Sequence, residues 1–126
     1  QFVALGAFGV DGEGRPLAER SRGLKLPLDE LSALGRAFHS GEVQSVSFDG
    51  ADLVAAFAEM IGRPRSGQVV VFPVLGAQRV ISIIYTDNGD REQPIEDIDI
   101  LEIATAQVGM AFENELLRRQ IGQPKE

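Results

Sequence analysis

The sequence has 126 residues, 44% of them hydrophobic, which is typical of one globular domain with an aliphatic core. Its 19 acidic and 12 basic residues give a net charge of −7, which argues against nucleic acids and anionic membranes as general partners. The chain has no cysteine, which excludes disulfides, thiolate metal sites and thiol nucleophiles and suits the cytoplasm, where we expect the protein to reside.

The ends of the sequence predict a fragment of a longer chain. No apolar run is long enough to span a bilayer, and no signal peptide is present. Position 1 is Gln rather than Met, so we expect residues 1–126 to be a single domain excised from a larger protein, with residues 121–126 as a tail.

The first elements are predicted to form a hairpin. Residues 2–10 are apolar on both faces, as in a buried strand, and Asp11-Gly12 begins a turn. Residues 16–24 return as an edge strand, because Pro16 and the arginines are typical of an edge. The glycines of this hairpin do not form a phosphate-binding loop: Gly6, Gly9, Gly12 and Gly14.

Two short helices separated by a strand over residues 43–48 are predicted next. Asp29 can cap the first helix, which ends at Gly41, and Asp49 can cap the second, which ends at Gly62. The residues expected to face inward are Leu31, Leu34 and Phe38 in the first helix and Leu53, Phe57 and Met60 in the second.

The second half of the chain predicts a central hairpin and a long helix. Residues 68–75 and 79–87 are rich in Val and Ile on both faces, as in strands covered by helices on each side. Residues 97–120 predict a helix whose charges match the helix dipole. Its acidic start and basic end comprise Glu96, Asp97, Asp99, Glu102, Arg118 and Arg119.

Residues 69–120 resemble the GAF family. Pro73-Val74 closes the first strand of the hairpin, and the returning strand ends on Ile83-Ile84-Tyr85-Thr86-Asp87-Asn88. The closing helix carries matching residues at Leu101, Ala104, Gln107, Ala111, Asn114 and Leu117. Ser82 stands where many relatives have Gly, and residues 25–62 match no subtype.

The resemblance implies an α+β, GAF/PAS-like three-layer domain. We expect a five-stranded antiparallel sheet in the order 2-1-5-4-3, with strands numbered along the chain, helices on both faces and a long C-terminal helix. The pairing of strand 1 with strand 5 comes from the resemblance. For function, it implies a non-catalytic sensory or regulatory domain of a bacterial-type signalling protein.

Several activities of GAF-like domains are excluded by residue type. Bilin attachment and methionine sulfoxide reduction need cysteine, and the cyclic-nucleotide signature is missing because the only lysines are Lys25 and Lys125. The single histidine, His39, is expected at a helix end on the surface rather than as a haem or metal ligand. We expect no enzymatic activity, no cofactor and no cyclic-nucleotide binding.

Two polar clusters allow a binding and a structural interpretation. The stretch 87–90, Asp-Asn-Gly-Asp, suggests calcium, but Gly89 occupies a ligand position, so a turn is favoured. Four arginines could receive an anion, although paired surface charges are the favoured interpretation: Arg20, Arg22, Arg63 and Arg65.

The closing helix is predicted to make two apolar contacts. One face is expected to pack on the sheet: Leu101, Ala104, Val108, Ala111 and Phe112. Ile103, Met110 and Leu117 recur every seven residues on another face, where a second copy or an absent N-terminal segment would cover them; we favour a homodimer. One hypothesis for function is that the domain binds a small molecule between sheet and helices and signals through its C-terminal helix. A dimerisation module with a filled core is the alternative.

Overall fold

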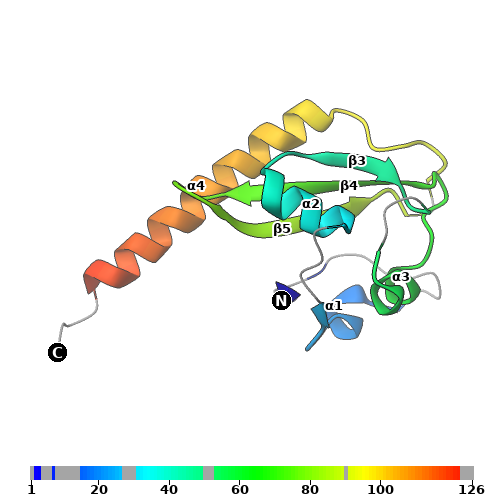
Figure 1. The fold of residues 1–126 in the computed structure, drawn as a ribbon, viewed down its shortest axis with the longest axis horizontal. Coiled ribbons are helices and arrows are strands. Elements are labelled where there is room, and N and C mark those ends of the chain that lie inside the picture. Colours follow the sequence, from blue (N-terminus) through cyan, green and yellow to red (C-terminus); the bar gives the residue numbers. More distant parts are fainter. Residues whose placement is uncertain are drawn as a thin grey trace.

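The structure is a computed structural model that describes residues 2–3, 7, 15–26, 31–49, 53–89 and 91–122 (Figure 1). Within these ranges the chain forms an α+β fold. The elements in chain order are β1 (Phe2–Val3), α1 (Leu17–Arg20), β2 (Lys25–Leu26), α2 (Ala33–Ser40), β3 (Gln44–Ser47), α3 (Ala55–Ile61), β4 (Gln68–Leu75), β5 (Val80–Asp87) and α4 (Ile98–Gly122).

The main sheet is antiparallel in the order β3-β4-β5. The hairpin predicted from the Val- and Ile-rich runs is confirmed, with Phe72 opposite Ile84 and Val69 opposite Asp87. An irregularity at Val74 and Leu75 shifts the register just before the turn. There the Gly76 N–H donates to the Arg79 carbonyl oxygen at 2.8 Å, which closes the loop between the strands.

One face of the sheet forms the core with α2 and α3. Val69 and Val71 of β4 are fully buried there, in one cluster with Leu34 and Ala37 of α2. Two side chains of α3, Phe57 and Met60, belong to the same cluster, as predicted. The ring of Phe57 meets that of Tyr85 edge-on, with centroids 5.0 Å apart. Aromatic and aliphatic side chains therefore occupy the space between α3 and the sheet.

The other face of the sheet is covered by α4. Side chains alternate along a strand, so Val70, Phe72 and Val74 point away from α2, and all three are buried. The helix contacts β4, and its C-terminal part extends past the sheet (Figure 1). A Cβ atom on Gly109 would lie 2.2 Å from the carbonyl oxygen of Leu75, so only glycine permits this approach.

The ends of α2 and α3 correct two predicted caps. Ser32, not Asp29, caps α2, because its side chain accepts the Gly35 N–H at 3.0 Å; Asp29 itself lies outside the described residues. Leu31 precedes the helix and is 75% exposed, so its inward assignment is wrong. Val54 begins α3 without a side-chain cap, and Asp49 pairs with an arginine instead. Gly41 ends α2 with a φ of 69°, as predicted.

The predicted five-stranded sheet in the order 2-1-5-4-3 is wrong, because strand 1 does not pair with strand 5 within the described residues; the order of the last three strands, β3-β4-β5, is as predicted. The described chain contains a three-stranded sheet and a separate two-stranded sheet in which β1 pairs with β2, with Phe2 opposite Leu26. The predicted edge strand over residues 16–24 instead holds α1, because Leu-Ala-Glu-Arg consists of good helix formers and proline is tolerated at a helix start. The turn glycines lie outside the described residues: Gly6, Gly9, Gly12 and Gly14.

The predicted core face of α4 is also wrong. Leu101, Val108 and Phe112 are 39%, 52% and 44% exposed, and Ala104 and Ala111 are exposed as well. The sheet is met by Thr105 and Gly109, which are buried and lie about 90° around the helix from the predicted face at 3.6 residues per turn. Small residues allow the helix axis to come close to the strand, whereas the larger side chains would hold it away.

Candidate functional site

The polar stretch that begins at Asp87, at the end of β5, forms a turn, as predicted. The Gly89 N–H donates to Asp87 Oδ1 at 2.9 Å, and Gly89 has a φ of 55°, which favours glycine. Asp90 lies outside the described residues. Among the described residues no group of three or more His, Asp or Glu side chains is placed to hold a metal ion.

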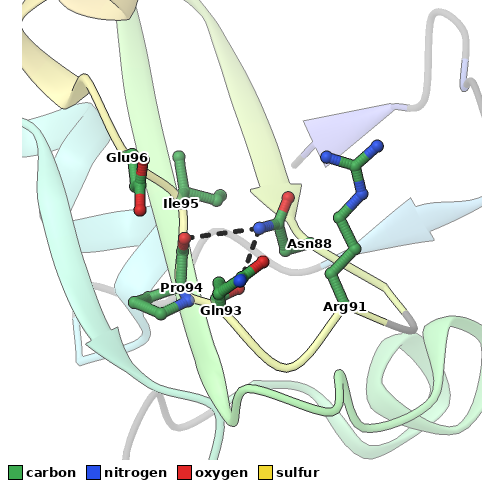
Figure 2. A pocket seen from close by; sticks show the side chains of 6 residues that line it. All are labelled: Asn88, Arg91, Gln93, Pro94, Ile95 and Glu96. Carbon is green, nitrogen blue, oxygen red and sulfur yellow. Dashed lines mark hydrogen bonds between the residues drawn. The ribbon is translucent and has the colours of Figure 1, made fainter.

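A hollow of about 350 Å³ lies beside the segment that leads from β5 to α4 (Figure 2). It is lined by Asn88, Arg91, Gln93, Pro94, Ile95 and Glu96. The Asn88 side-chain amide donates to the carbonyl oxygens of Gln93 and Pro94, at 2.8 and 3.3 Å, and so ties this segment together. Arg91 and Glu96 are both exposed. The Asn88 side chain therefore has a structural role, and the charged groups of the hollow are exposed to water.

Tyr85 joins the core to this turn. Its ring packs on Phe57, and its hydroxyl donates to Asp87 Oδ2 at 3.1 Å. Burial raises the pKa of Tyr85 well above its usual range, and the negative charge of Asp87 and the hydrogen bond to it raise it further. Both oxygens of Asp87 are thus engaged, one by the hydroxyl and one by the backbone of Gly89.

The raised pKa of Tyr85 predicts alkaline unfolding. The folded-state pKa lies above the unfolded value of about 10, so this contribution to stability is complete below pH ~10 and is lost as the pH rises further. Tyr85 is the only tyrosine, so the ultraviolet absorbance of tyrosinate reports on it alone. We expect tyrosinate to appear together with the loss of circular dichroism, and Tyr85→Phe to weaken the pH dependence. Ionisation at pH ~10 in protein that is still folded would contradict this prediction.

Two of the arginine candidates are paired with acids. The Arg63 guanidinium donates to Asp49 Oδ2 at 3.1 Å, and Arg65 lies 2.6 Å from Glu92. All four side chains are exposed, so these pairs contribute little to stability. Arg20 lies at the end of α1 and Arg22 in the turn after it, both exposed. The interpretation of these arginines as surface charges is supported for Arg63 and Arg65.

His39 and the acidic residues lie where the sequence placed them. His39 is exposed in the last turn of α2, with its ring edge-on to Phe38 at 5.4 Å. Asp99 and Glu102 are exposed in the first turns of α4. Asp97, just before the helix, has a φ of 56°. None of these groups is buried.

The outward side of α4 is the most unusual surface of the described chain. Ile103, Met110 and Leu117 are 62%, 67% and 48% exposed, and we call them the outer stripe. Leu101, Val108 and Phe112 form a second exposed group, here called the flank stripe. Isolated exposed apolar residues are common, but contiguous groups mark interaction sites.

A second hollow, of about 300 Å³, lies on α4 beside the outer stripe. It is lined by Asp99, Glu102, Ile103 and Ala106. Their spacing of i, i+3, i+4 and i+7 is that of the four-residue hole that receives a side chain from a neighbouring helix. Neither this hollow nor Ile100, which is 63% exposed, was predicted from the sequence, although the helical period places both beside Ile103.

Comparison with protein-family models, curated proteins and solved structures finds no match. The resemblance to the GAF family therefore stays a prediction from the residues that carry it. Within the described residues, no helix combines the length and the apolar character that crossing a membrane requires. Function must be inferred from the surface of α4 and the packing of the core.

Proposed function

We propose that this domain is a non-catalytic assembly module that forms a homodimer through the outward side of α4. One observation carries the proposal: three large apolar side chains of the outer stripe, at seven-residue spacing, are about half to two-thirds exposed. A second copy would remove this surface from water, and two-fold dimers are the commonest protein assembly.

The packing of the core favours assembly over a small-molecule sensor. A ligand pocket would be expected between the sheet and the helices α2 and α3. Phe57, Met60 and Tyr85 pack in that space. The two hollows described above lie elsewhere, one beside residues 88–96 and one on α4. A sensory role in a larger signalling protein rests on the GAF resemblance alone.

Met110→Glu tests the proposal. It places a charge in the middle of the outer stripe, where burial against a second copy would remove the carboxylate from water. We expect the unsubstituted chain to be a dimer by light scattering at tens of micromolar, and Met110→Glu to be a folded monomer. The apparent dissociation constant of the Met110→Glu dimer should be at least about a hundredfold weaker than that of the unsubstituted chain, which corresponds to ~3 kcal/mol.

Val108→Glu is the matched control, since it places the same charge on the flank stripe of the same helix. Val108 is 52% exposed, and its substitution should leave the dimer intact while circular dichroism shows both variants to be folded. A monomeric unsubstituted chain would contradict the proposal. Dissociation by Val108→Glu but not by Met110→Glu would transfer the interface to the flank stripe.

A further inference from the structure

Six exposed residues of α4 follow a coiled-coil pattern. Starting at Ile100, the spacing alternates between three and four residues through Ile103 and Met110 to Leu117. We call this set the α4 seam: Ile100, Ile103, Gln107, Met110, Asn114 and Leu117. In heptad terms, Ile100, Gln107 and Asn114 occupy the a positions, and the residues of the outer stripe occupy the d positions.

The α4 seam lies opposite the sheet. At 3.6 residues per turn, its centre is about 150° around the helix from the side where Thr105 and Gly109 meet the sheet. All six seam residues are exposed. A second helix can therefore lie along the seam without displacing the strands. The last turns of α4 extend past the sheet and leave further room there (Figure 1).

The two polar residues of the seam distinguish parallel from antiparallel pairing. In an antiparallel coiled coil, a positions face d positions, so Asn114 would face Ile103 of the other copy and Gln107 would face Met110. Each amide would then be covered by an apolar side chain, which costs free energy because its hydrogen bonds with water are lost. In a parallel pair every residue meets its own copy. Two Asn114 side chains, or two Gln107 side chains, can then bond each other.

Residues beside the seam also favour parallel pairing. Parallel pairing brings a g position next to the following e position of the partner, which places Glu113 beside Arg118 of the other copy, with opposite charges. The other flanking positions include Ala104, Ala106 and Ala111, whose small side chains allow the helices to approach closely. A single buried Asn at an a position is a known means of specifying register in two-stranded parallel coiled coils.

We propose that two copies of this chain pack along the α4 seam as a parallel two-stranded coiled coil, with the direction set by Asn114 and Gln107. This inference rests on the proposed homodimer and adds its orientation to it. The two sheets then lie on opposite outer sides of the helix pair, and the C-terminal ends of both α4 helices emerge together.

Disulfide cross-linking tests the orientation directly, because the chain has no cysteine of its own. Ile103→Cys, Leu117→Cys and Ile100→Cys are made singly and treated with a mild oxidant at a concentration where light scattering shows dimers. A disulfide needs Cα atoms within about 7 Å, a distance reached only by facing positions across closely packed helices. Glu115→Cys, exposed on another side of α4, is the matched control.

Parallel pairing predicts that each of the three seam variants cross-links to itself, with roughly tenfold more covalent dimer than Glu115→Cys gives. An equimolar mixture of Ile100→Cys and Leu117→Cys, distinguished by a mass tag, then yields no 100–117 disulfide. If that mixed disulfide forms and self-cross-linking fails, the pair is antiparallel and the orientation is wrong while the homodimer stands. If light scattering shows only monomers for the unsubstituted chain, the proposed function itself fails.

Discussion

Gly109→Ala should lower the free energy of unfolding by about 3 kcal/mol, the upper range for overpacking a rigid contact. The added Cβ atom would lie 2.2 Å from the carbonyl oxygen of Leu75 and 3.1 Å from its carbonyl carbon. Both are backbone atoms, so no rotamer change relieves the overlap, and α4 must move away from β4. Val70, Phe72 and Val74 would then lose part of their cover.

Helix propensity alone would predict the opposite effect for Gly109→Ala. On an open helix surface, replacing glycine by alanine stabilises by about 1 kcal/mol, so a loss at Gly109 must come from the contact with Leu75. Ala106→Gly, at an exposed position of the same helix, is the control and should cost only about 1 kcal/mol. Urea unfolding followed by circular dichroism measures both. A Gly109→Ala variant as stable as the unsubstituted chain would show that α4 does not approach β4 as described.

The hairpin could be predicted from sequence because its signals are local. The Val- and Ile-rich strands of β4 and β5 and the turn at Gly89 each depend on residues within a few positions of one another. Gly41 and Gly62 mark the ends of α2 and α3 for the same reason. Such signals are set by backbone conformation and side-chain alternation, which a single sequence displays.

The pairing of strand 1 with strand 5 could not be predicted in this way. It would join distant segments, and it was carried over from the family resemblance rather than from a residue pattern, whereas the order of β3, β4 and β5 was predicted correctly from the short connections between them. The first strand pairs with the next strand along the chain, as expected of a hairpin, but that strand is Lys25–Leu26 and not residues 16–24. The strand predicted over residues 16–24 instead holds the helix α1. Pro16 is compatible with both an edge strand and a helix start, so the proline does not distinguish between them.

The orientation of α4 was missed because the helix has several apolar faces. Hydrophobic periodicity selected Leu101, Val108 and Phe112, yet the sheet is met by Thr105 and Gly109. Close approach of a helix to a strand is decided by small residues as well as by hydrophobic ones. In contrast, the exposure of the outer stripe agrees with its prediction as a surface outside the domain core, although the occupant of that surface is a proposal.

The second large effect is expected at Phe72, in the centre of β4. Its side chain is 2% exposed and lies on the face of the sheet that α4 covers. Phe72→Ala removes a ring from a closely packed layer between two rigid elements, which cannot collapse fully into the space. We expect the free energy of unfolding to fall by about 4 kcal/mol, within the range for buried phenylalanine, and the chain to be largely unfolded if its total stability is near the lower end for small domains.

Ile84→Ala is the matched control because Ile84 is directly opposite Phe72 on β5 and its side chain is 36% exposed. Its truncation should cost about 1 kcal/mol, since it removes less apolar area from a site partly open to water. Both variants are unfolded in urea at the same protein concentration as the unsubstituted chain, because dimerisation would make stability depend on concentration. Equal losses for the two variants would mean that α4 covers β4 and β5 alike; a small loss at Phe72 would mean that α4 leaves the sheet readily.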